Sequence, residues 1–197
     1  MSVAFHWHPA SAERWADLAA LFGARGACGG CWCMFWRLPR KDWEAGKGEK
    51  NRRALHRIVK AGGEPGILGY LGGDPVAWCA VAPRTEYVHL ERSRVLKPVD
   101  DAPVWSVSCL FVKKTSRRQG LSVKMLQAAV AFAAARGATV VEGYPVEPAK
   151  GSAPDAFVWT GLASAYRQAG FREVARRSPT RPIMRRACGP ALVHNPG

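Results

Sequence analysis

The sequence lacks an apolar run long enough to cross a membrane. Its longest apolar stretch in a helical pattern, Leu126–Ala135, is interrupted by Gln127, whereas a spanning helix needs about 20 apolar residues. The N-terminus has no basic leader followed by a long apolar region, so we expect no secretory signal. Together these absences predict a cytoplasmic protein with reduced thiols and no membrane partner.

Acidic residues are scarce. The chain has 15 Asp and Glu against 29 Lys and Arg, for a net charge of +14, and such a surface attracts nucleic acid, anionic lipid or a phosphorylated ligand. Six arginines gather near the C-terminal end, at positions Arg172, Arg176, Arg177, Arg181, Arg185 and Arg186. They either contact RNA or form a solvated hairpin face, and we favour the second interpretation.

A complete set of metal ligands is also missing. Cys28, Cys31 and Cys33 are closely spaced, but no second cysteine pair and no His-x-x-x-His follows to complete a tetrahedral zinc site. We therefore expect no metal.

The aromatic and apolar residues around these cysteines are Trp32, Met34, Phe35 and Trp36. They could pack in the core or form the wall of an apolar substrate pocket.

The 197 residues suffice for one domain with a full hydrophobic core. Periodicity and turn residues predict a strand at 3–8, helices at 11–22 and 41–60, strands at 66–71, 75–81 and 104–112, a helix at 119–136, a strand at 138–146, a helix at 157–169, and strands at 171–177 and 181–187. This order predicts a mixed α/β sheet and not a doubly wound one.

A basic turn joins the strand that ends near Val112 to the helix that begins at Gln119 or Gly120. Gly120 permits a close backbone approach and Ser122 is small. The first N–H groups of a helix lack carbonyl partners and lie at the positive end of its dipole. The segment therefore predicts an anion site, although it matches neither the Walker A nor the GxGxxG pattern.

The pattern Val112-x4-Arg117-x-x-Gly120-x-Ser122 resembles the acetyl-coenzyme A motif of the GNAT N-acetyltransferase superfamily, with Ser122 in place of Gly or Ala. The segment from Tyr166 to Gly170-Phe171 is similar to the end of a later helix in that family. The resemblance implies the GNAT fold in a single domain, 1–188, with an acceptor side at 1–63, a cofactor-binding core at 64–188 and a loose tail at 189–197. A homodimer is compatible with it.

The resemblance also implies roles for individual residues. The strands at 104–112 and 138–146 would splay apart, which exposes backbone groups of Leu110 and Val112 to acetyl-CoA. Arg117 would flank the pyrophosphate. The N–H donors to the pyrophosphate would be those of Arg118, Gln119, Gly120, Ser122 and Val123.

Acetyl transfer to an amine sets three chemical requirements. The amine must lose a proton, which Glu142 or a water chain would accept. The developing oxyanion needs a donor, for which the Leu110 amide is the candidate. Tyr166 stands where many relatives place the acid that protonates the leaving thiolate.

The leading hypothesis is an N-acetyltransferase that uses acetyl-CoA on a primary amine of a small molecule, a peptide N-terminus or a lysine. Two alternatives remain: acetylation of charged tRNA, and a non-catalytic basic module that binds nucleic acid. The basic charge alone supports them.

Overall fold

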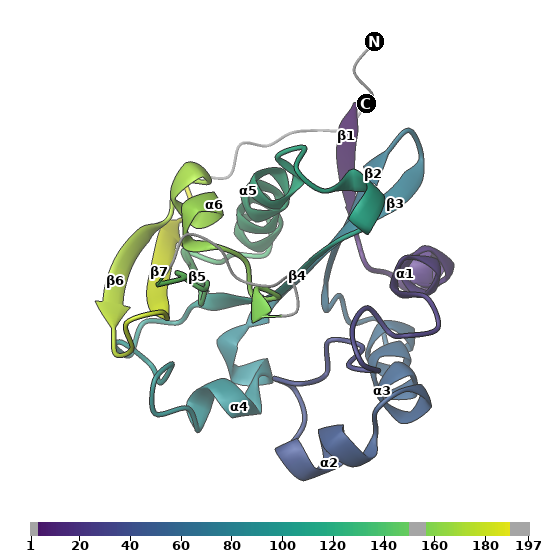
Figure 1. Ribbon diagram of the computed structural model, residues 1–197, viewed down its shortest axis with the longest axis horizontal. Coiled ribbons are helices and arrows are strands. Elements are labelled where there is room, and N and C mark those ends of the chain that lie inside the picture. The colour runs from purple at the N-terminus through teal and green to yellow at the C-terminus, as the bar shows by residue number, and fades with distance from the viewer. Residues whose placement is uncertain (1–3, 150–156, 190–197) are drawn as a thin grey trace.

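The computed structural model describes residues 4–149 and 157–189, which form one seven-stranded sheet with helices on both faces (Figure 1). The strand order is β1-β2-β3-β4-β5-β7-β6, antiparallel except for the parallel pair β4–β5. The strands are β1 (Phe5–Pro9), β2 (Gly66–Leu71), β3 (Asp74–Pro83), β4 (Trp105–Val112), β5 (Val140–Gly143), β6 (Arg172–Arg176) and β7 (Pro182–Ala187). The helices are α1 (Trp15–Phe22), α2 (Arg40–Ala45), α3 (Glu49–Lys60), α4 (Val88–Glu91), α5 (Leu121–Ala134) and α6 (Ala163–Gln168).

The predicted mixed sheet and the predicted order of its strands along the chain are confirmed, with local corrections to three elements. The single helix expected at 41–60 is two helices, because a turn at Gly46–Gly48 separates α2 from α3. The connection at 83–103 contains the short α4. The helix expected from 157 begins only at Ala163, after Gly161 with φ +88°. Apart from Gly189, the predicted tail lies outside the described residues, and the division into 1–63 and 64–188 stays a prediction.

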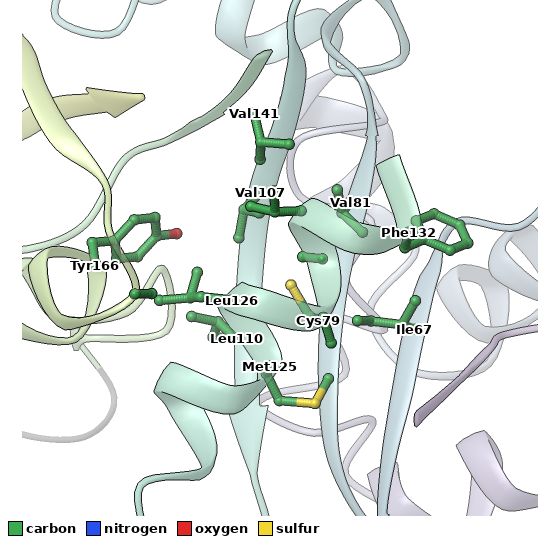
Figure 2. Close-up of a cluster of buried hydrophobic side chains, with 14 of the residues drawn as sticks. Ile67, Cys79, Val81, Val107, Leu110, Met125, Leu126, Phe132, Val141 and Tyr166 are labelled. Carbon is green, nitrogen blue, oxygen red and sulfur yellow. The ribbon is translucent and has the colours of Figure 1, made fainter. Parts of the chain in front are cut away.

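The central strand β3 is buried on both faces: its successive residues point to opposite sides, and each side packs against a hydrophobic cluster. Cys79 packs toward α5, in a cluster with Ile67, Met125 and Phe132 (Figure 2). Trp78 belongs to the opposite cluster, which contains residues of α1 and α3 and of the loop between α1 and α2. This explains why β3 is a nearly continuous apolar run without the alternation of a half-exposed strand.

The expected splay between β4 and β5 is present. The two strands pair over three positions only, from Trp105 with Val141 to Val107 with Gly143. A register shift against β3 follows directly, where Ala80 pairs with Cys109 and Val81 with Val107, so that Ser108 is an extra residue in β4. Such a bulge bends the strand that carries it, and β4 diverges from β5 beyond this point.

Within the described ranges, no helix has both the length and the apolar character needed to cross a membrane.

Candidate active site

Two adjoining cavities lie along the diverging end of β4 and the start of α5. The larger has a volume of about 670 Å³ and the smaller about 190 Å³, and both are lined by Val112, Arg117, Arg118 and Ser122. Seven of the eight residues predicted to hold the cofactor line one or both: Leu110, Val112, Arg117, Arg118, Gly120, Ser122 and Val123. Gln119 is the exception.

The turn before α5 has the backbone shape of an anion site. Gly120 is the N-cap of α5 with φ +73°, and Arg118 is also left-handed with φ +62°. A Cβ added at Gly120 would meet no atom within 4 Å, so it would extend into open space at the smaller cavity. The carbonyl of Gly120 accepts the N–H of Val123 at 3.1 Å.

This geometry changes one predicted contact and adds another. Because the Val123 N–H is used inside the helix, Val123 is a poor donor to a ligand. Leu121 and Ser122 are the first two helical residues, where N–H groups have no helical carbonyl to bond. Leu121 lines the smaller cavity and was missed because its apolar side chain carries no signal of a backbone contact.

The backbone of β4 presents polar groups to the gap, as expected. The Leu110 N–H donates to the carbonyl of Trp159 at 2.8 Å. The Val112 carbonyl accepts from Nε of Arg117 at 3.1 Å. Neither partner belongs to β3, so both groups point away from the sheet neighbour and toward the splayed side. The sequence contained no indication that Trp159 would lie there.

Tyr166 is fully buried on α6. Its hydroxyl donates to the carbonyl of Thr160 at 3.2 Å, and its ring packs edge-on against Phe171. Figure 2 shows the side chain reaching from α6 toward β4. Burial, with a smaller contribution from Cys79, raises the pKa of Tyr166 well above its usual value. The hydroxyl is therefore a proton donor held next to the gap, although it does not line either cavity.

Glu142, the predicted base, lies in a buried ion-pair network. One carboxylate oxygen accepts from Arg84 at 3.0 Å and from the Tyr144 hydroxyl at 2.7 Å, and the other accepts from Arg185 at 2.7 Å. Its side chain is completely buried and does not line the cavities. The role as base stays untested, but a carboxylate saturated by two guanidinium groups is a structural anchor by geometry.

Residues 32–150 match the model of the acetyltransferase (GNAT) family, which is more than half of the chain. The chain belongs to the GNAT acetyltransferase family. The match spans the splayed strand β4, the basic turn and α5, where the cavities lie.

Solved structures share the fold of this chain. A GNAT-family acetyltransferase from Listeria monocytogenes aligns over 95% of this chain and 98% of its own, with a TM-score of 0.57 and 9% identity. PaiA N-acetyltransferase from Thermoplasma acidophilum, solved in complex with coenzyme A, aligns over 93% of this chain and 99% of its own, with a TM-score of 0.52 and 13% identity. The yncA protein from Salmonella typhimurium, solved with its cofactor acetyl-CoA, aligns over 94% of this chain and 95% of its own, with a TM-score of 0.53 and 13% identity. These identities establish the fold alone, and no curated protein sequence matches the chain.

The aromatic loop of this GNAT protein is mostly core. Trp32, Met34 and Trp36 are buried, and the Trp36 indole N–H donates to the carbonyl of Ser108 at 3.1 Å. Phe35 is partly exposed and contacts Trp159 at 5.5 Å between ring centroids. None of the four lines the cavities, whereas Ala27 and Cys28 of the same loop line the larger one. Among these four residues, which were candidates for the wall of the substrate pocket, Phe35 alone is both partly exposed and in contact with Trp159, the residue that bonds Leu110.

The cysteines form no metal centre among the residues that the structure describes. Cys33 and Cys109 are buried with their sulfur atoms 3.3 Å apart, and both are free thiols. Burial raises the pKa of Cys31 to about 11, so this thiol is protonated at neutral pH. Cys33 and Cys109 are therefore packed in the core, whereas Cys28 is exposed and Cys31 is partly buried.

The arginines of the β6–β7 hairpin are largely engaged within the fold. Arg185 pairs with Asp100 and Glu142, and Arg176 with Glu147 and Glu173. Arg177 donates to the carbonyls of residues 95, 97 and 98. These contacts fit the interpretation of a solvated structural hairpin, because guanidinium groups held by carboxylates and carbonyls have fewer donors left for phosphates.

Proposed function

We propose that this GNAT protein transfers an acetyl group from acetyl-CoA to a primary amine. One observation supports this most directly: the cavities follow the splayed edge of β4 from Leu110 to the N-terminus of α5. A long ligand with an anionic end and a polar, amide-containing arm suits that shape. When bound, acetyl-CoA supplies an activated acyl thioester.

The turn before α5 would hold the pyrophosphate. The backbone N–H groups of Leu121 and Ser122 are placed for it, with the left-handed residues Arg118 and Gly120 shaping the approach. Lys114 and Arg117 also line the larger cavity and add positive charge. The side-chain-free surface at Gly120 allows the phosphates to approach the backbone closely.

The transfer chemistry would use two donors at the other end of the gap. The Leu110 N–H would stabilise negative charge on the acyl oxygen. The Tyr166 hydroxyl, which burial keeps protonated at neutral pH, would hydrogen-bond to the departing thiolate and pass it a proton as the hydroxyl regains one from water. Because Glu142 is saturated by Arg84 and Arg185, we assign removal of the amine proton to water.

The acceptor is an amine in neutral form that approaches from the side of Phe35. The aromatic group around Phe35 contains Trp36, Trp43, His89 and Trp159. Such a surface favours an amine carried on an apolar or aromatic body, whether small molecule, peptide N-terminus or lysine.

Gly120→Val tests the cofactor site. The fold should survive, since a Cβ there meets no neighbour. The side chain should block the phosphate approach and remove two charge-assisted hydrogen bonds, each worth about 1.5–3 kcal/mol, so acetyl-CoA binding should weaken at least about 100-fold. Isothermal titration calorimetry measures the affinity, and release of CoA thiol with a panel of amines measures activity.

Gly137→Val is the matched control. Gly137 follows the other end of α5 with φ +83° and open space around a Cβ, so it has the same left-handed strain without touching the site. Unchanged acetyl-CoA affinity in a folded Gly120→Val protein would overturn the site. Binding without thiol release for any amine would leave a GNAT-fold binding module instead.

A further inference from the structure

Two consecutive peptide carbonyls satisfy the two donors that the proposed chemistry needs. The Trp159 carbonyl accepts the Leu110 N–H at 2.8 Å, and the next carbonyl, of Thr160, accepts the Tyr166 hydroxyl at 3.2 Å. The first donor would face an acyl oxygen and the second a thiolate. The carbonyls of Trp159 and Thr160, which belong to successive peptide groups, thus occupy the two donors that would act on a thioester.

The segment is fastened between the two splayed strands. On the β4 side it bonds Leu110. On the other side the carbonyl of Gly161 accepts the N–H of Val146 at 2.8 Å, just beyond β5. Leu162 continues this as a parallel bridge to Val146. Residues 159–162 therefore lie in the opening that separation of β4 from β5 creates, where Trp159, Gly161 and Leu162 line the larger cavity.

The tight fit of this segment depends on a glycine. Gly161 has φ +88°, and a Cβ on it would lie 2.8 Å from Cδ1 of Leu110 and 2.9 Å from Cε2 of Tyr166. A side chain at this position would strain the left-handed backbone and press on the Leu110 and Tyr166 side chains, so we expect it to loosen the contact between the segment and Leu110.

The indole of Trp159 connects the same segment to the acceptor side. Its ring lies 5.5 Å from that of Phe35 and 5.7 Å from that of Trp36. Trp36 in turn is bonded to the carbonyl of Ser108, two residues before Leu110. Withdrawal of the segment from Leu110 would therefore also disturb the aromatic group near the amine.

We propose that residues Trp159–Gly161 form an internal strap that mimics the thioester and closes the acyl end of the site until acyl-CoA displaces it. This rests on the proposed function. In the closed state the strap keeps both buried donors hydrogen-bonded, as buried polar groups require. Acetyl-CoA must replace the strap at Leu110, so its apparent affinity is lowered by the fraction of closed protein.

The strap predicts a ranking among three ligands. Acetyl-CoA has the thioester carbonyl that competes with Trp159 for the Leu110 N–H. CoA lacks that carbonyl. Adenosine 3′,5′-bisphosphate lacks the whole pantetheine arm and reaches only the phosphate turn. Loosening the strap should therefore strengthen acetyl-CoA binding most, CoA less, and the bisphosphate not at all.

Gly161→Ala is the loosening variant, and Gly137→Ala is the control with equal backbone strain and no contact within 4 Å. Calorimetry with the three ligands should show acetyl-CoA binding about tenfold tighter in Gly161→Ala, with adenosine 3′,5′-bisphosphate unchanged and Gly137→Ala like wild type. Hydrogen exchange of the ligand-free protein should be faster in a peptide containing Leu110. If Gly161→Ala does not fold, Trp159→Ala removes the indole anchor and should shift the ligands in the same order.

Unchanged ratios among the three ligands in both variants would overturn the strap while leaving the cofactor site intact. Equal strengthening of all three would overturn it as well, because the effect would not concern the acyl end. Failure of wild type to bind any of the three would overturn the proposed function itself, and with it the strap.

Discussion

The two ends of the cleft are built in opposite ways. At the β4–α5 turn the site is open and consists mainly of backbone around Gly120, where an added Cβ meets nothing within 4 Å. At the other end, near α6, Trp159 and Gly161 line the larger cavity, an added Cβ at Gly161 would lie under 3 Å from Leu110 and Tyr166, and carbonyls of the protein accept from the Leu110 N–H and the Tyr166 hydroxyl. The backbone at Gly120 is uncovered, whereas the donors at the other end already have partners within the protein.

The part of the cleft proposed to bind phosphate and the part proposed to transfer the acetyl group are therefore built by different means. An anion site at a helix N-terminus needs only local geometry and can stand open to water. The acyl end contains buried donors, which are costly to leave unpaired. Carbonyl groups of the protein accept their hydrogen bonds, so a ligand must replace those acceptors.

Glu142→Gln is expected to have the largest effect at the end near α6, as a loss of stability. Removing the charge leaves the buried Arg84 without its closest buried anion, which should cost about 3–5 kcal/mol. Urea unfolding measures this. Glu91→Gln is the matched control, since Glu91 also bonds Arg84 at 2.8 Å but is half exposed, and it should cost below about 1 kcal/mol.

The opposite outcome for Glu142→Gln, a loss of activity without a loss of stability, would change the role assigned to Glu142. If its urea midpoint matched that of wild type while acetylation was lost, Glu142 would be the base that the sequence suggested, and its network would be catalytic as well as structural.

Tyr166→Phe should have the second-largest effect, and this effect should be on kcat. Losing the general acid should lower kcat about 100-fold or more, while the lost bond to Thr160 should cost only about 1 kcal/mol of stability. Tyr144→Phe is the control: Tyr144 is a buried tyrosine of the Glu142 network and should change stability without a comparable change in kcat. Equal kcat for Tyr166→Phe and wild type would remove Tyr166 from the mechanism.

The alkaline pH profile is a poor test of Tyr166. An acid fails when pH rises through its pKa, and burial raises the pKa of this phenol well above its usual value near 10. We therefore expect no alkaline loss of rate from Tyr166 up to about pH 10.

Phe35→Ala should have the smallest effect and concerns the amine alone. It removes the partly exposed ring that touches Trp159 and His89, so KM for the amine should rise roughly three- to tenfold, a loss of about 1 kcal/mol. The acetyl-CoA affinity should change less than the amine KM. Val174→Ala, at an exposed position on β6, should leave both values at the wild-type level. An unchanged amine KM in Phe35→Ala would place the acceptor elsewhere.

Local signals predicted the strands and helices and the turn before α5. The hairpin around Gly72-Gly73 and the strand–turn–helix at Gly120 are each encoded within a few residues, and both were confirmed. The N–H of the predicted donor Val123 bonds the Gly120 carbonyl in the first turn of α5, which is also a local effect.

The candidate residues that the structure places away from the cavities lie where distant segments meet. Glu142 was a candidate base because it is the only carboxylate on its strand, but Arg84 and Arg185 reach it from other elements. Trp32, Met34 and Trp36 were candidates for a pocket wall, yet the sheet covers them.

The sequence by itself determined the succession of strands and helices along the chain, the turn that opens α5 and the GNAT resemblance, because hydrophobic periodicity and glycine conformation act over short distances. The tertiary structure alone decided what lies in the gap between β4 and β5. Leu110 and Trp159 are far apart in the chain, and their hydrogen bond forms only because a bulge at Ser108 opens β4 and a glycine at 161 lets the returning chain fit against it.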